Sequence, residues 1–214
     1  MRQIAVVRGG GLGSSATYVS RNPSTNQAGN GDSTNMSATP DGRYGVFESL
    51  ATNLVANDTN GVADIFRFEV AGGQLVSLTR VSVTKTGAQA NGASRNATIS
   101  ADGRVVTFET DATNLVTPDT NNASDVIVKL IDTGDILRQS GASASQEPNG
   151  ASTKPSISGD GSTVAYGSGA SNLIPNDTNN AADVFSSSVR SPPQDEPRLA
   201  AYAFHEGRKL GLAI

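Results

Sequence analysis

Three stretches of the chain alternate hydrophobic and polar residues with a period of two, the pattern of a β-strand that buries one face. They are Tyr44–Ser49, Val105–Thr110 and Thr163–Ser168, and β-branched or aromatic side chains are frequent in them. An Asp-Gly pair comes shortly before each stretch, and Asp-Gly between two extended segments favours a tight hairpin turn. The pattern therefore predicts three equivalent hairpins in one chain.

Each hairpin belongs to a larger set of predicted strands. These are expected at Asn35–Thr39, Asn96–Ser100 and Lys154–Ser158 before the turns, at Ile65–Val70, Val126–Ile131 and Val184–Val189 after the hairpins, and at Leu75–Val83 and Ile136–Ser140 in fourth position. Four antiparallel strands within about 60 residues are typical of one blade of a β-propeller.

The sets recur at a nearly fixed period. An Asn-Gly pair opens each unit at Asn30, Asn91 and Asn149, so successive units are offset by 61 and then 58 residues. Such a period indicates one supersecondary unit stacked on copies of itself. The predicted fold class is all-β: a β-propeller-like stack of four-stranded antiparallel blades, with about three and a half blades in this chain. The predicted divisions are outer strands of an incomplete blade at 1–29, repeats at 30–90, 91–148 and 149–190 (the last incomplete), and a linker with an unrepeated tail at 191–214.

The half blade has a consequence for partners. Ile4–Val7 and Thr17–Ser20 align with the third and fourth strands of the first repeat, without the two inner strands that would complete a blade. Open strand edges are seldom left unpaired in native proteins. We therefore expect a protein partner or a second copy, as a homo-oligomer or a head-to-tail assembly. The alternative is that the chain is a piece of a longer protein that carries the other blades. In the tail, residues 199–204 are a candidate fourth strand for the last repeat, and a short helix is the other interpretation.

The repeats resemble those of TolB-like β-propellers over roughly residues 30–190. The segment from Ser100 to Phe108 follows the Ser-x-Asp-Gly-x-x-hydrophobic-x-Phe turn and strand of that family. Asp64-Ile65-Phe66 and Asp183-Val184-Phe185 follow its Asp-hydrophobic-aromatic strand. The resemblance implies a propeller that serves as a binding or structural module.

An acidic loop lies before the third strand of every unit. Short loops that place Asp or Asn at alternate positions supply the oxygen ligands that Ca²⁺ prefers. The same residue types also form turns, because their side chains bond to the nearby backbone. Both interpretations, a possible calcium site and a structural Asx-turn, are open at this stage. The candidate metal ligands are Asp58, Asn60 and Asp64, then Asp119, Asn121 and Asp125, and finally Asp177, Asn179 and Asp183.

Composition narrows the class of partner. The chain of 214 residues has a net charge of -4 and no run of Lys or Arg, so nucleic acid is not an expected partner. It has no cysteine, and it has no apolar stretch of the roughly 18 residues that a membrane span needs. We expect a secreted, periplasmic or cell-surface protein, although the first 20 residues show no apolar core long enough for a signal peptide.

The sequence does not predict catalysis. His205 is the only histidine and lies in the unrepeated tail, without the second His of a zinc-hydrolase motif. We assign no catalytic and no cofactor-binding residues, apart from the possible Ca²⁺. The predicted function is a non-catalytic module for protein interaction or self-assembly. Two alternatives are a propeller hydrolase, or its accessory domain, acting on glycans or peptides, and a calcium-dependent lectin.

Overall fold

The computed structural model describes residues 5–7, 16–141, 146–179 and 181–189, and these residues form strands, turns and loops without a helix. The strands form two four-stranded sheets, one three-stranded sheet and one two-stranded pair, all antiparallel. The predicted all-β, propeller-like fold class is thereby confirmed. None of the described residues belongs to a helix long and apolar enough to cross a membrane.

The sheets follow the repeats in chain order. The pair is β1 (Ala5–Val7) and β2 (Ala16–Tyr18); the first repeat holds β3 (Ser33–Ala38), β4 (Tyr44–Ser49), β5 (Asp64–Ala71) and β6 (Gln74–Arg80); the second holds β7 (Ser94–Ile99), β8 (Val105–Thr110), β9 (Asp125–Leu130) and β10 (Ile136–Arg138); the third holds β11 (Ser152–Ile157), β12 (Thr163–Ser168) and β13 (Asp183–Ser188). The residues of the tail, 191–214, lie outside the described part of the chain.

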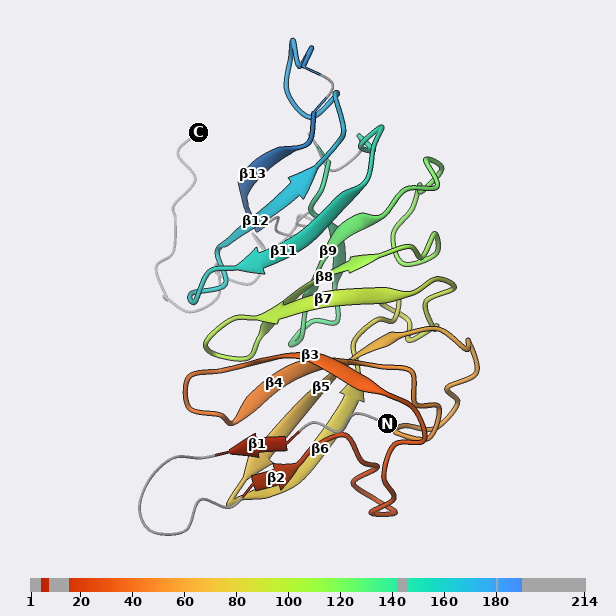
Figure 1. Ribbon diagram of the computed structural model, residues 1–214, viewed down its shortest axis with the longest axis vertical. Helices are drawn as coiled ribbons and strands as arrows, with labels where there is room; N and C mark the ends of the chain where they lie inside the picture. Colours follow the sequence, from red (N-terminus) through yellow and green to blue (C-terminus); the bar gives the residue numbers. More distant parts are fainter. Residues whose placement is uncertain (1–4, 8–15, 142–145, 180, 190–214) are drawn as a thin grey trace, which may run out of the picture.

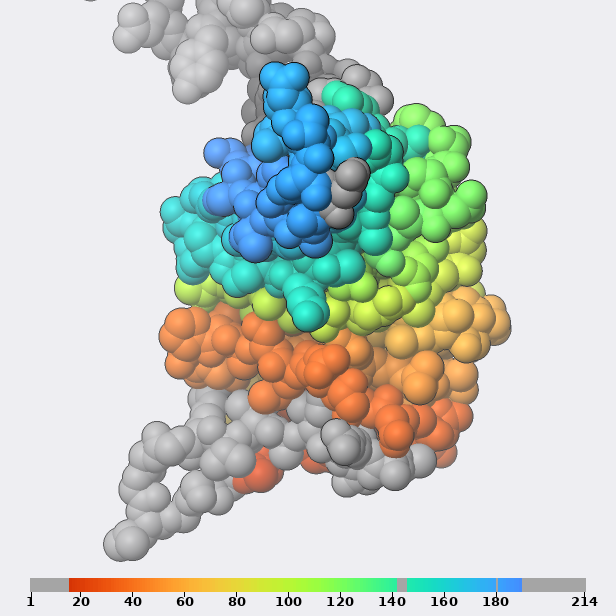
Figure 2. Space-filling model, turned by 45° about the horizontal axis from the view of Figure 1, so that its top comes forward, coloured from red at the N-terminus to blue at the C-terminus, as the bar shows by residue number. Residues whose placement is uncertain are grey.

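The sheets stack one on the next along the long axis of the molecule (Figure 1). The first strands of the three repeats lie next to one another, β3 against β7 and β7 against β11, and we call them the inner strands. The space-filling view shows the repeats as successive bands from orange to blue (Figure 2). Neighbouring repeats therefore contact each other face to face, as the blades of a propeller do.

Alternate residues of each strand explain the stacking. Phe47 and Phe66 are fully buried on one face of the first sheet, and their rings stack 5.7 Å apart. Val46 and Ile65, the residues next to them, are fully buried on the opposite face in a cluster with residues of the second repeat. Because successive side chains of a strand point to opposite faces, each sheet contributes to the cores on both of its sides.

The Asn-Gly pairs hold each unit together at one end. The Asn30 side chain donates to the Thr52 hydroxyl (3.0 Å) and accepts from the Thr52 backbone N–H (2.8 Å). Asn53 accepts from the Asn30 backbone N–H at 2.9 Å. A Cβ on Gly31 would lie 2.6 Å from the Leu50 carbonyl carbon, so only glycine fits beside this clamp. The same bonds recur at Asn91 with Thr113 and Asn114, and at Asn149 with Ser171 and Asn172.

The third sheet differs from the other two on its outer face. Val184 of β13 is 84% exposed, whereas its counterparts Ile65 and Val126 are fully buried against the following repeat. Within the described part of the chain, β13 has β12 as its only strand neighbour. This face is where a further layer of structure would pack if one were added.

Candidate functional site

Every inner strand contains a bulge at the same position of the repeat. The bulges are centred on Asn35, Asn96 and Lys154, whose φ angles are 49°, 54° and 52°. The strand pairing shifts register at each of them. Asparagine adopts this left-handed conformation more readily than most residues, which explains the first two positions. Lysine has no such preference, so Lys154 holds a conformation that its own side chain does not favour.

A buried glutamate connects the first two bulges. Glu48 is 9% exposed and accepts the Asn35 side-chain amide at Oε1 (2.9 Å). The same oxygen accepts the backbone N–H of Asn96, which belongs to the next repeat. One carboxylate oxygen therefore joins the inner strands of two neighbouring repeats.

The second repeat repeats this connection to the third. Glu109 is 4% exposed, and its Oε2 accepts the Asn96 side-chain amide (3.0 Å) and the Lys154 backbone N–H (3.1 Å). The equivalent position of the third repeat is Gly167, which has no side chain to continue the series. We call these two bonded sets, centred on Glu48 and Glu109, the glutamate latches.

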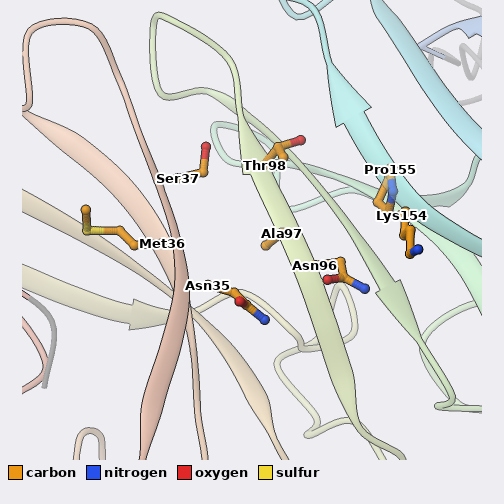
Figure 3. Close-up of a pocket in the computed structure, with 8 residues that line it drawn as sticks. All are labelled: Asn35, Met36, Ser37, Asn96, Ala97, Thr98, Lys154 and Pro155. Atoms are coloured by element: carbon orange, nitrogen blue, oxygen red, sulfur yellow. The ribbon is translucent and has the colours of Figure 1, made fainter. Parts of the chain in front are cut away.

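The bulges also line a shallow groove of about 290 Å³ that runs across the three inner strands. Its lining residues are Asn35, Met36, Ser37, Asn96, Ala97, Thr98, Lys154 and Pro155 (Figure 3). Met36 is 42% exposed there. Among the described residues, the Lys154 ammonium has no ion pair or hydrogen bond, and the side-chain oxygens of Asn35 and Asn96 accept none. The groove thus offers two neutral acceptors and one positive charge.

The acidic loop of the first repeat surrounds an arginine. Arg80 Nη1 lies 3.0 Å from Asp58 Oδ1 and 3.1 Å from Asp64 Oδ2, and all three side chains are at most 8% exposed. Asp64 also accepts the Ser82 hydroxyl at 2.5 Å and the Asn60 amide at 3.0 Å. The positively charged guanidinium of Arg80 pairs with both carboxylates and is their counter-charge.

The second loop repeats the arrangement with one more acid. Arg138 Nε lies 2.7 Å from Asp125 Oδ2, and Arg138 Nη2 lies 3.6 Å from Asp119 Oδ2. Glu147 stands where the first repeat has Gln89, and it lies 3.3 Å from Arg138. Burial raises the pKa of Asp119 and Asp125, and the Thr120 hydroxyl, ahead of the other contacts, lowers the pKa of Glu147.

The third loop is the most exposed of the three. Asp177 and Asp183 are only half-buried, and no arginine of the described residues lies beside them. Asn179 accepts the Ala181 backbone N–H at 2.8 Å, an Asx-turn bond. Asn60 and Asn121 make the same bond to Val62 and Ala123.

These contacts bear on the calcium interpretation without testing it. Among the residues that the structure describes, no three His, Cys, Asp or Glu side chains are grouped to hold a metal ion. A cation in the first loop would have to displace Arg80 from between Asp58 and Asp64. Burial raises the pKa of Asp58, and the charge of Asp64 adds to the rise. The geometry favours the structural turn for the first two loops, and Ca²⁺ stays a prediction for all nine candidate ligands.

The Asp-Gly turns have a testable titration. The Ser158 hydroxyl donates to Asp160 and, with the Ser162 backbone N–H, lowers the pKa of Asp160 from 3.8 to about 2. Because the folded pKa is depressed, this carboxylate stabilises the fold above its ordinary pKa, and the stabilisation is lost as the pH falls through about 2. We expect Ser158→Ala to return the pKa of Asp160 towards 3.8, measured by carboxyl-carbon NMR. Ser156→Ala, on an exposed strand position, is the control, and an ordinary pKa in the unmodified protein would contradict the assignment.

The sequence identified the acidic loops as equivalent sites, but it did not predict the arginines that pair with them or the glutamates that join the repeats. Arg80 and Arg138 recur at an offset of 58 residues, and Glu48 and Glu109 at an offset of 61. These recurrences were the available signal. They become meaningful only when the fold places each arginine on the fourth strand and each glutamate beneath the next bulge.

Comparisons with known proteins find solved structures that are similar to this chain at low identity. No model of a protein family and no curated protein matches the chain. Similar solved structures include one assigned as a TolB from Agrobacterium tumefaciens (17% identity, TM-score 0.40, covering 62% of this chain and 36% of that one) and TolB from Acinetobacter baumannii (18%, 0.39, 80% and 39%). The tricorn protease is a third (14%, 0.40, 64% and 11%). The chain thus spans less than half the length of each of these structures.

Proposed function

We propose that this chain is a non-catalytic β-propeller module that binds a partner protein along the groove across its inner strands. The observation that carries the proposal is the row formed by Asn35, Asn96 and Lys154 in that groove. Most of the other repeated polar side chains, in the Asn-Gly clamps and the first two acidic loops, make hydrogen bonds or ion pairs within the fold. In the groove, three polar groups from successive repeats have unused bonding capacity and lie side by side.

The chemistry of the row indicates the kind of segment that it binds. Amide oxygens of Asn35 and Asn96 accept hydrogen bonds from backbone or side-chain N–H groups of an extended peptide. The Lys154 ammonium adds a preference for a carboxylate at one end of that peptide. Met36 supplies an adaptable apolar contact beside them.

A pair of peptides tests this assignment. We expect an acidic capped hexapeptide to shift the NMR amide signals of the groove residues, and an isosteric hexapeptide with Gln for Glu and Asn for Asp to bind more weakly. Lys154→Ala should weaken the acidic peptide about tenfold and leave the neutral one nearly unchanged, because one charge-assisted bond is lost. Lys85→Ala, which removes an exposed lysine outside the groove, is the matched control. Shifts that avoid the groove, or an equal effect of both lysine variants, would contradict the proposal.

Self-assembly is a second candidate, favoured by the exposed Val184 face of β13. A second copy that packs there would bury the valine as Ile65 and Val126 are buried between repeats. The mass of the chain in solution decides between this candidate and a separate partner. Secretion and stabilisation by calcium stay predictions, as do the hydrolase and lectin alternatives.

A further inference from the structure

A second pocket, of about 240 Å³, lies where β3 begins and β4 ends in the first repeat. It is separate from the groove across the inner strands. Its lining residues are Asp32, Thr34, Glu48, Ser49, Leu50 and Ala63. The buried latch residue Glu48 is therefore also one of the residues that line this open space.

The second repeat has the same architecture at this place, but there the space is filled. Arg95 lies directly opposite Glu109 on the neighbouring strand, as Thr34 lies opposite Glu48. Arg95 Nη1 is 3.3 Å from Glu109 Oε1, and Arg95 Nη2 contacts the Asp111 carboxylate. A guanidinium thus neutralises the buried glutamate of the second repeat from within the chain.

The first repeat lacks that neutralising group. Thr34 replaces the arginine and Leu50 replaces Asp111 at an offset of 61 residues. Glu48 uses Oε1 for its latch, and Oε2 has no bonding partner among the described residues. The Glu48 residue as a whole is only 9% exposed, and among the described residues no cation lies beside its carboxylate. A largely buried residue that carries an unneutralised charge is costly, and a cation would relieve that cost.

We propose that this pocket binds the guanidinium of an arginine side chain from a partner protein. The guanidinium would donate to Glu48 Oε2, as Arg95 donates to Glu109, and the hydroxyl of Thr34 supplies a further acceptor. Leu50, 56% exposed, would cover the apolar stem of the arginine. The planar fork of arginine suits this place better than a lysine ammonium, because the filled copy in the same chain holds that group.

Capped single residues test the pocket directly. We expect N-acetyl-arginine methylamide to shift the NMR amide signals of Thr34, Glu48, Leu50 and Ala63 with a dissociation constant in the millimolar range. The citrulline analogue has the same shape without the charge, and it should bind at least about tenfold more weakly. Absence of shifts at these residues, or equal binding of the two compounds, would overturn the proposal.

Two variants locate the effect without removing the fold. Glu48→Gln keeps an oxygen for the latch and removes the charge, and we expect it to weaken the arginine compound about tenfold. Thr34→Arg places in the first repeat the group that fills the second, so it should abolish binding and raise the melting temperature. Retained binding in Thr34→Arg would overturn the proposal even if Glu48→Gln fails to fold.

The converse variant creates a second pocket. Arg95→Thr combined with Asp111→Leu gives the second repeat the residues of the first, and the number of arginine compounds bound should rise from one to two. A stoichiometry that stays at one in a folded variant would overturn the assignment of the two places as equivalent.

The source of the arginine is settled by mass in solution. If sedimentation shows an assembly that the arginine compound or Glu48→Gln dissociates, the arginine comes from a second copy. A monomer that still binds the compound supports a separate partner protein. This test is independent of the groove, because Lys154→Ala leaves the pocket intact and the pocket variants leave Lys154 in place.

Discussion

Replacing Arg80 by methionine is expected to lower the free energy of unfolding by about 3–5 kcal/mol, because it leaves two buried carboxylates without the cation that lies beside both of them. Asp58 and Asp64 would then face each other at 4% and 0% side-chain exposure with no counter-charge between them. The methionine keeps most of the volume of the arginine stem, so the loss reports on charge more than on packing. Urea unfolding followed by circular dichroism measures it.

Two further variants show whether charge is the cause. Asp64→Asn in the Arg80→Met background should recover part of the loss, since it removes one of the two stranded carboxylates. Arg43→Met breaks the ion pair with Glu69 on the surface, where the arginine side chain is 53% exposed, and should cost less than about 1 kcal/mol. A loss below 1 kcal/mol for Arg80→Met would contradict the role given to this residue.

The same proteins bear on calcium. A ligand that binds only the folded state raises the melting temperature as its concentration increases. If the loops hold Ca²⁺ in the unmodified protein, a chelator lowers its melting temperature and calcium restores it. If the arginines serve as the counter-charges, we expect that response only after Arg80→Met frees Asp58 and Asp64 for a cation.

Removing the second latch is expected to lower the free energy of unfolding by about 3 kcal/mol. Each buried donor that loses its acceptor costs roughly 1–3 kcal/mol. In Glu109→Ala the Asn96 amide and the Lys154 backbone N–H lose their shared oxygen, and Arg95 loses one of its two carboxylates. The loss should concentrate between the second and third repeats. Hydrogen exchange at the Lys154 amide measures this local opening, and urea unfolding measures the total.

The repeat itself supplies the controls. Glu109→Gln keeps an acceptor oxygen and should cost much less than Glu109→Ala. Gly167→Ala alters the equivalent position of the third repeat, where an added Cβ meets no atom nearer than 3.9 Å, and should be nearly neutral. Equal stability of Glu109→Ala and Gly167→Ala would show that the latch does not hold the repeats together.

The architecture was accessible from sequence because its signals are local. Alternation marked Tyr44–Ser49 and its two copies, and β4, β8 and β12 begin and end at the predicted residues. The glycines of the Asp-Gly turns have positive φ, with 66° at Gly42 and 75° at Gly103, as the hairpin requires. Strand ends near bulges were less accurate: β3 begins at Ser33, two residues before the prediction, since the bulge at Asn35 interrupts the alternation.

The candidate site was less accessible because its bonds cross repeats. The sequence around Glu48 does not predict that its carboxylate accepts a hydrogen bond from the backbone N–H of Asn96, 48 residues away. Likewise, the acidic loop resembles a cation site until the fold brings Arg80 into it from the fourth strand. Charge pairs of this kind depend on tertiary neighbours, whereas strands and turns depend on residues close in sequence.

The glutamate latch gives the stack a direction, since each carboxylate accepts from the inner strand of the repeat that follows it, and neither bonds to the preceding repeat among the residues that the structure describes. If residues 91–148 were duplicated, the added repeat would form a glutamate latch with the repeat before it and another with the repeat after it. Duplicating the third unit would not, because Gly167 ends the series. The order of the repeats is therefore set by one glutamate in each of the first two repeats, and circular rearrangement of the repeats would break at least one of the two latches.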